Sequence, residues 1–251
     1  MVFLVAAVTL LGVAVYAELA HERVLVPQPL TGIDPAVVRS IEVRCAACRT
    51  RRFARDKSGW RMLEPYALPA DAEAVARLLA IAHAPVQERH PLHDYDPAKL
   101  GLEPAQITLK FDDLVIAIGG ENPIDHDRYV RIGDELLRVP DRFGARLLEA
   151  PESELDRRPV APTARISGVG LRGESARRDL ASAWQNAVAI GVRVAGTETG
   201  GIPALVDLAD GSRLPFAVIR SGAGYVVRRA DPELDYLFDE AHARELLGER
   251  D

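Results

Sequence analysis

The chain has 251 residues, of which 48% are hydrophobic and 27% are charged, and its formal net charge is −6. This composition is typical of a folded globular protein and excludes a largely disordered chain. The acidic balance disfavours a nucleic-acid partner, which binds to a concentrated basic face. The length is sufficient for one large domain or two small ones.

The chain begins with an apolar segment that we expect to lie in a lipid bilayer. Residues 1–17 carry no charged side chain, and the first charge is that of Glu18. A helix of this length, at about 1.5 Å per residue, approaches the lower limit for crossing a hydrocarbon core of about 30 Å. Leu19 and Ala20 extend it slightly. We therefore predict a single-pass transmembrane anchor over residues 1–20 and a tether over residues 21–32.

A cleavable signal peptide is the alternative interpretation of this segment, because Val15-Tyr16-Ala17 offers residues that suit a signal peptidase. No basic residue precedes the apolar run, and the run is longer than a usual signal-peptide core, so the anchor is favoured. Both interpretations export the remainder. We place residues 21–251 in the periplasm, on the extracytoplasmic side of the cell inner membrane.

The two cysteines, Cys45 and Cys48, lie in a turn between two predicted strands, residues 38–44 and 51–55. In an oxidising compartment, two cysteines this close form a local disulfide if the backbone geometry permits it. A thioredoxin-type pair needs its first cysteine at a helix N-terminus, and no helix is predicted to follow here. Free thiols, redox-active thiols and metal ligation remain as alternatives. Because the loop is short, the bridge should pin the turn rather than hold the fold together.

An arginine-rich segment follows the cysteine pair. Its arginines alternate with Thr50 and Phe53, a pattern typical of a solvated strand face, and comprise Arg49, Arg51, Arg52 and Arg55. We therefore predict exposed arginines here and no nucleic-acid interface.

Further along the chain, one order of segments occurs twice. The first copy has an amphipathic helix over residues 70–82, then a hairpin formed by residues 107–111 and 114–118, a strand at Tyr129, and a closing helix near residues 141–148. A Gly-x-x-Pro-Ala mark precedes the hairpin. Residues 151–162, rich in proline and charge, read as a linker.

The second copy repeats this order. We predict an amphipathic helix over residues 174–188, with Leu180, Trp184 and Val188 on one side, then a second Gly-x-x-Pro-Ala mark, a hairpin, a strand at Tyr225 and a closing helix near residues 240–247. The expected fold class is α+β.

The full prediction is an N-terminal transmembrane helix followed by two tandem modules of mostly antiparallel sheet with flanking helices. The first module covers residues 33–150 and the second, diverged module covers residues 163–251.

Four short motifs carry a resemblance to a known family. They are Ile33-Asp-Pro-Ala-Val-Val-Arg-Ser-Ile-Glu-Val43, Gly59-Trp60-Arg61-Met62, Pro69-Ala-Asp-Ala-Glu-Ala-Val75, and Tyr95 with Gly101-Leu-Glu-Pro104. Together they resemble the family catalogued as domain of unknown function 4340, over roughly residues 30–158. The resemblance implies one N-terminal membrane helix, an exported body and, for some members, association with ABC-type transporters. It implies no catalytic residues.

Three other motifs are weaker. His90, His93 and Asp94 flank Pro91, in a spacing that matches no standard zinc site, so we predict a solvated loop. The turn at residues 125–127 reads as a polar hairpin turn.

The glycines of Gly168-x-Gly170-x-x-Gly173 lack the parallel strands and the acidic residue of a dinucleotide-binding unit. We therefore predict that the chain binds no metal, no nucleotide and no other cofactor. The sequence has no recognisable hydrolase or nucleotide-hydrolysing motif, so we do not predict an enzyme.

The sequence favours a membrane-anchored scaffold or binding subunit that contacts protein partners in a membrane assembly, such as a transporter. Two alternatives remain: an envelope thiol-disulfide oxidoreductase that uses Cys45 and Cys48, and a small-ligand receptor with a pocket between the modules.

Overall fold

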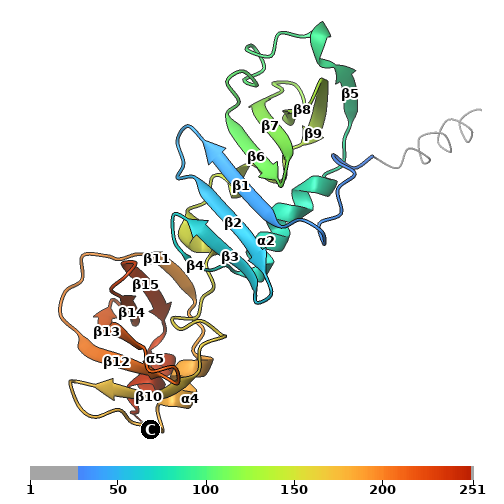
Figure 1. Ribbon diagram of the computed structural model, residues 1–251. Coiled ribbons are helices and arrows are strands. Elements are labelled where there is room, and N and C mark those ends of the chain that lie inside the picture. The colour runs from blue at the N-terminus through green and yellow to red at the C-terminus, as the bar shows by residue number, and fades with distance from the viewer. Residues whose placement is uncertain (1–27, 250–251) are drawn as a thin grey trace, which may run out of the picture.

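The computed structural model describes residues 28–249, and the segment predicted as a membrane anchor lies outside them. Within the described residues, most of the regular secondary structure lies in two antiparallel sheets, and the helices are few and short. Figure 1 shows the two sheets in separate bodies, which we call the first unit and the second unit. The structure thus has a mostly antiparallel β architecture.

The first unit contains a nine-stranded sheet in the order β4-β3-β2-β1-β6-β7-β8-β9-β5. Its strands are β1 (Ser40–Cys45), β2 (Arg51–Asp56), β3 (Gly59–Glu64), β4 (Leu68–Pro69), β5 (Glu88–Pro91), β6 (Ile107–Phe111), β7 (Leu114–Glu121), β8 (Asp127–Ile132) and β9 (Glu135–Pro140). Its α-helices are α2 (Ala72–Leu79) and α3 (Gly144–Leu147). Its 3-10 helices are η1 (Ala80–His83), η2 (Leu92–Asp94) and η3 (Pro151–Glu154).

The second unit contains a six-stranded sheet in the order β10-β12-β13-β14-β15-β11. Its strands are β10 (Ile166–Leu171), β11 (Gly191–Val194), β12 (Ile202–Leu208), β13 (Arg213–Ser221), β14 (Gly224–Arg229) and β15 (Leu234–Phe238). Its helices are α4 (Ala181–Asn186) and α5 (Glu240–Leu247), which lie side by side against the sheet.

The two sheets share one topology. In each, a meander of four strands is flanked on one side by the strand that opens the unit and on the other by a strand from the segment before the meander. The orders β1-β6-β7-β8-β9-β5 and β10-β12-β13-β14-β15-β11 therefore correspond strand for strand. The first unit differs by adding β2, β3 and β4 outside β1. The recurring order of segments in the sequence thus corresponds to a recurring sheet order.

Alternating burial explains why these segments form strands. In β6, Ile107, Leu109 and Phe111 are buried, and the residues between them are partly exposed. This period of two is what a sheet with one face on a core requires. The core side of the first sheet is covered by α2, whose Val75 and Leu78 are fully buried. The Asp71 carboxylate caps α2 by accepting a hydrogen bond of 2.8 Å from the Ala74 N–H.

Two predicted helices are shorter than expected. The helix predicted over residues 174–188 is limited to α4, and Val188 is 45% exposed. The prediction was wrong ahead of α4 because the chain folds back along β10, where Val169 and Arg177 form a β-bridge. The closing helix of the first unit is a single turn, α3, whereas α5 has the predicted bounds.

Candidate functional site

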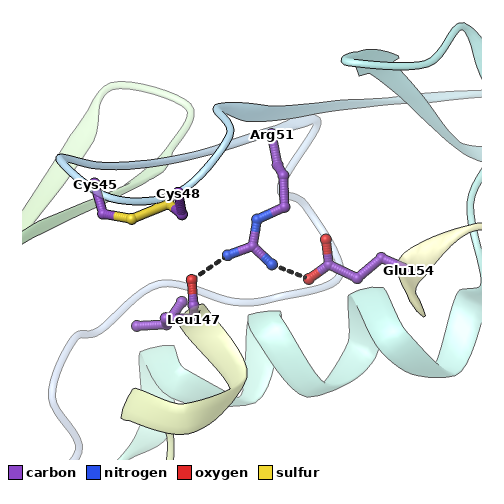
Figure 2. Close-up of a disulfide and its surroundings, with 5 residues drawn as sticks. All are labelled: Cys45, Cys48, Arg51, Leu147 and Glu154. Carbon is purple, nitrogen blue, oxygen red and sulfur yellow. Dashed lines mark hydrogen bonds and ion pairs between the residues drawn. A yellow bond between two sulfur atoms is a disulfide. The ribbon is translucent and has the colours of Figure 1, made fainter. Parts of the chain in front are cut away.

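The disulfide turn lies where β1 ends. Cys45 is the last residue of β1, Cys48 precedes β2, and a disulfide joins them with their Cα atoms 5.4 Å apart (Figure 2). The segment that follows is a strand and not a helix, so the pair lacks the helix dipole that lowers a thiol pKa in thioredoxin-type sites. This location favours a structural link that holds the turn.

Arg51, the first residue of β2 after this turn, has its side chain in the interior of the first unit. The Arg51 side chain is 0% exposed and the Glu154 side chain 2% exposed. Arg51 Nη1 donates to Glu154 Oε1 at 2.7 Å, and Arg51 Nη2 donates to the carbonyl oxygen of Leu147, at the end of α3 (Figure 2). A buried guanidinium requires such partners, because an unpaired charge in the interior is strongly destabilising.

The sequence prediction of a solvated arginine face was wrong for Arg51. Arg51 shares its side of β2 with Phe53, which is also buried, whereas Arg52 is half exposed on the other side. This two-residue period is a signal that could have identified Arg51 as an inward-facing residue. Its partner Glu154 is too distant in the sequence for any local pattern to pair the two.

A second ion pair lies beside the first. Arg49 Nη1 donates to the Tyr66 hydroxyl at 2.8 Å and to Glu152 Oε1 at 3.0 Å. The guanidinium lies 4.9 Å from the centroid of the Tyr66 ring, and the Tyr66 hydroxyl in turn donates to Glu152. Arg49, in the loop before β2, thus pairs with Glu152 of η3, and Arg51 of β2 pairs with Glu154 of η3.

Burial raises the pKa of one group in each of these two ion-pair clusters. The pKa of Glu154 is raised to about 7, because the loss of hydration outweighs the attraction of Arg51. Burial and the hydrogen bond with Glu152 also raise the pKa of Tyr66. Glu154 therefore changes its charge near neutral pH.

These ion pairs hold a segment that we call the strap, residues 151–157. Leu155 of the strap forms a β-bridge with Ala70, and the Asp71 N–H donates to the Glu154 carbonyl at 2.9 Å. At its other end, the Arg157 carbonyl accepts a hydrogen bond of 2.9 Å from Ala189 N–H, just before β11. The segment predicted as a linker is therefore packed on the first unit and hydrogen-bonded to the second.

The second unit has a polar cluster of its own. Asp235 is fully buried and accepts hydrogen bonds from Arg228 Nε at 2.7 Å and Gly196 N–H at 2.9 Å. Burial raises its pKa, but these hydrogen bonds hold the pKa of Asp235 below its usual value.

The carboxylate of Glu198 completes this cluster. Glu198 accepts from Ser221 Oγ and from Arg193 Nη2, both at 2.7 Å, and the Ser221 contact is the main reason that the pKa of Glu198 is lowered to about 2. The positive charges of the two arginines balance the negative charges of the two carboxylates, which leaves little net charge for a ligand. The hydrogen bonds of the cluster hold the loop between β11 and β12 in place.

The remaining motifs lie apart from these sites. His90 is on the edge strand β5, where Nε2 lies 3.1 Å from Glu88 Oε2, and His93 is in η2. Among residues 28–249 there is no group of three or more His, Cys, Asp or Glu side chains arranged to hold a metal ion.

The Gly168-x-Gly170-x-x-Gly173 motif lies in β10 and the turn after it. A Cβ at Gly170 would lie 2.7 Å from the carbonyl oxygen of Glu174, because the returning chain passes directly over the strand. Close backbone approach therefore accounts for this glycine.

The family comparison agrees with the resemblance in the sequence. The model of the family described as "Domain of unknown function (DUF4340)" matches residues 60–178, from β3 through the strap to the segment after β10. Neither the curated proteins nor the solved structures include a match to the chain. The chain is thus similar to the DUF4340 family over residues 60–178.

Proposed function

We propose that this protein is a membrane-anchored scaffold or binding subunit whose two β units face the extracytoplasmic side and contact other proteins of a membrane assembly. The proposal combines the uncharged apolar segment at residues 1–17 with the DUF4340 match. Within residues 28–249 no helix is long and apolar enough to span a bilayer. In this proposal the anchor is the segment of residues 1–20.

The contacts of the strap with both units are the main support for the scaffold role. It is held to the first unit by the ion pairs of Glu152 and Glu154 and to the second unit through the Arg157 carbonyl. Such a connection joins the two units through a segment with contacts to both, which suits a protein that presents both units to its partners. An anchor would add a high effective concentration next to a membrane partner.

Fractionation of membranes tests this proposal in two steps. We expect the full chain to remain with the membrane after washing with alkaline carbonate, and its body to be digested only by a protease on the extracytoplasmic side. Affinity purification from detergent-solubilised membranes should then recover a membrane protein partner. Release by carbonate would refute the anchor, whereas a purification that recovers no partner would refute the role in an assembly.

The Cys45–Cys48 disulfide supports one alternative function, a thiol-disulfide oxidoreductase. Its position between two strands argues against this function, because no helix N-terminus stabilises a thiolate there. The reduction potential distinguishes the two roles. A value below about −300 mV is typical of structural disulfides, whereas catalytic pairs have higher potentials.

A further inference from the structure

The Cys45–Cys48 bridge closes a loop that the strand pairing leaves open. The last pair between β1 and β2 joins Val43 and Arg51. Beyond this pair, β1 pairs only with β6, and residues 46–50 belong to no strand. The disulfide therefore ties the returning chain to the end of β1 (Figure 2).

Arg49, the residue after Cys48, joins this loop to the strap. Its Nη1 donates to Glu152 Oε1 at 3.0 Å and to the Tyr66 hydroxyl at 2.8 Å. The Arg49 side chain is 52% exposed, whereas the Glu152 side chain is only 6% exposed. Without Arg49, the buried Glu152 carboxylate would keep the Tyr66 hydroxyl but lose its counter-ion, so the strap should loosen. Arg51 differs, because strand pairing fixes its backbone without the bridge.

The strap passes this contact on to the second unit. The 3-10 helix η3, which carries Glu152, lies against β11. After η3, the Arg157 carbonyl accepts a hydrogen bond of 2.9 Å from the Ala189 N–H. One short helix thus touches Arg49 on the first unit and the edge strand of the second unit, so a change at the bridge reaches the junction between the units.

The bridge lies at the surface of the protein. Cys45 and Cys48 are partly exposed, and Ala46 and Ala47 at the tip of the turn are exposed, so a reductant can approach the bridge in the folded protein. In thiol–disulfide exchange, a thiolate of a dithiol attacks one sulfur and forms a mixed disulfide, and the second thiol of the dithiol then releases the protein. The two cysteines gain two electrons and two protons and become thiols, and the dithiol becomes a disulfide.

We propose that the Cys45–Cys48 disulfide is a redox-sensitive latch for the strap. The oxidised bridge holds Arg49 on Glu152. Reduction by a dithiol frees the loop, releases this ion pair and loosens the junction between the two units, while Arg51 still holds the strap further along. In this role the cysteines receive electrons from a reductant, whereas an oxidoreductase would pass them to substrates. The inference rests on the proposed scaffold role and adds a way to regulate it.

Hydrogen–deuterium exchange of the purified full chain in detergent tests the latch. The oxidised protein is compared with protein treated with dithiothreitol, and alkylation of a parallel sample verifies that both thiols are free. The reporters are the Leu155 amide, which donates to the Glu152 carbonyl, and the Ala189 amide, which donates to the Arg157 carbonyl. We expect reduction to speed exchange at both amides about tenfold or more, the change expected when one charge-assisted contact is lost. Exchange in the hairpin of β12 and β13 should not change.

Three variants serve as controls. Cys45→Ser/Cys48→Ser should exchange like the reduced protein, and dithiothreitol should have no further effect on it. Arg49→Gln should show the fast exchange even in the oxidised protein, so reduction should add little. Arg44→Gln is the matched control, because Arg44 lies on the other side of the bridge and pairs with Glu42 instead of the strap. Reduction should affect this variant as it affects the unmodified sequence.

The inference fails if the bridge resists dithiothreitol in the folded protein, or if both thiols are free and exchange at Leu155 and Ala189 is unchanged. It also fails if the hairpin of β12 and β13 exchanges faster to the same degree, which would indicate unfolding of the second unit instead of release of the strap. A full effect of reduction in Arg49→Gln would contradict it as well. None of these results affects the membrane fractionation or the recovery of a partner, so failure of the latch and failure of the scaffold role are separable.

Discussion

Replacing Arg51 by methionine should destabilise the first unit in a pH-dependent manner. The substitution keeps an unbranched side chain in the same space but removes the positive charge that faces Glu154 at 2.7 Å. It also removes the donor to the Leu147 carbonyl. Removing one partner of a buried ion pair costs about 3–5 kcal/mol, because the other charge stays buried without compensation.

The pKa of Glu154 gives the pH dependence. Its value of about 7 in the folded protein exceeds the ordinary value of 4.5, so the folded state binds this proton more tightly than the unfolded state. The resulting stabilisation is complete below about pH 4.5 and is lost as the pH rises to about 7. At about 1.4 kcal/mol for each pKa unit, it amounts to roughly 3 kcal/mol in the native protein.

The loss of the ion pair and the raised pKa of Glu154 together determine how much stability Arg51→Met should lose at pH 5 and at pH 8. At pH 5 the folded protein holds Glu154 neutral, so Arg51→Met should cost about 1–3 kcal/mol, mainly from unpaired hydrogen-bonding groups. At pH 8 the loss should rise to about 3–5 kcal/mol, because the isolated carboxylate must either stay charged or take up a proton. The double variant Arg51→Met/Glu154→Leu should recover most of this loss, since it replaces both charges by apolar groups.

Urea unfolding at pH 5 and pH 8 measures these differences. Trp60 fluorescence in a Trp184→Phe background reports on the first unit alone. Arg52→Met is the matched control, because Arg52 is half exposed on the other side of β2 and its ion pairs should contribute less than about 1 kcal/mol. Equal losses at the two pH values, or a loss for Arg51→Met no larger than for Arg52→Met, would refute the reasoning.

Three further substitutions test other parts of the fold by thermal unfolding. Replacing Cys45 and Cys48 by serine should cost at most about 2 kcal/mol, since the bridge closes a very short loop; a protein that no longer folds would show that the bridge holds more than its turn. Asp239→Ala should cost about 1 kcal/mol, because it removes the N-cap of α5, and an unchanged melting temperature would contradict that role. Trp184→Phe should also cost about 1 kcal/mol through the lost hydrogen bond to Leu246, and a stabilised variant would argue against it.

Local periodicity was sufficient to predict the strands that have one buried face. The hairpin of β6 and β7, the strands that contain Tyr129 and Tyr225, and α5 all lie where the alternating or helical pattern indicated. In these segments each residue's exposure follows from its own position in the repeat, so no distant partner is needed.

The same method did not work where the chain contacts itself over long distances. The helical spacing of Leu180, Trp184 and Val188 is real in the sequence, but the residues before α4 pair with β10 instead. The inward position of Arg51 follows from the two-residue period of β2, but its ion pair with Glu154 does not, because no local pattern pairs residues so far apart in the sequence. In both cases the missed feature is a tertiary contact, and before α4 that contact overrides the local helix propensity.

The burial of the strap has a practical consequence for dividing this protein into fragments. A fragment of the first unit that stops at Ala150 would omit Glu154 and leave the Arg51 guanidinium in an apolar interior without its counter-ion. A fragment that continues through Val160, which is also buried, would retain it. Even so, the Arg157 carbonyl would lose the Ala189 N–H, so the two halves are best expressed as one polypeptide.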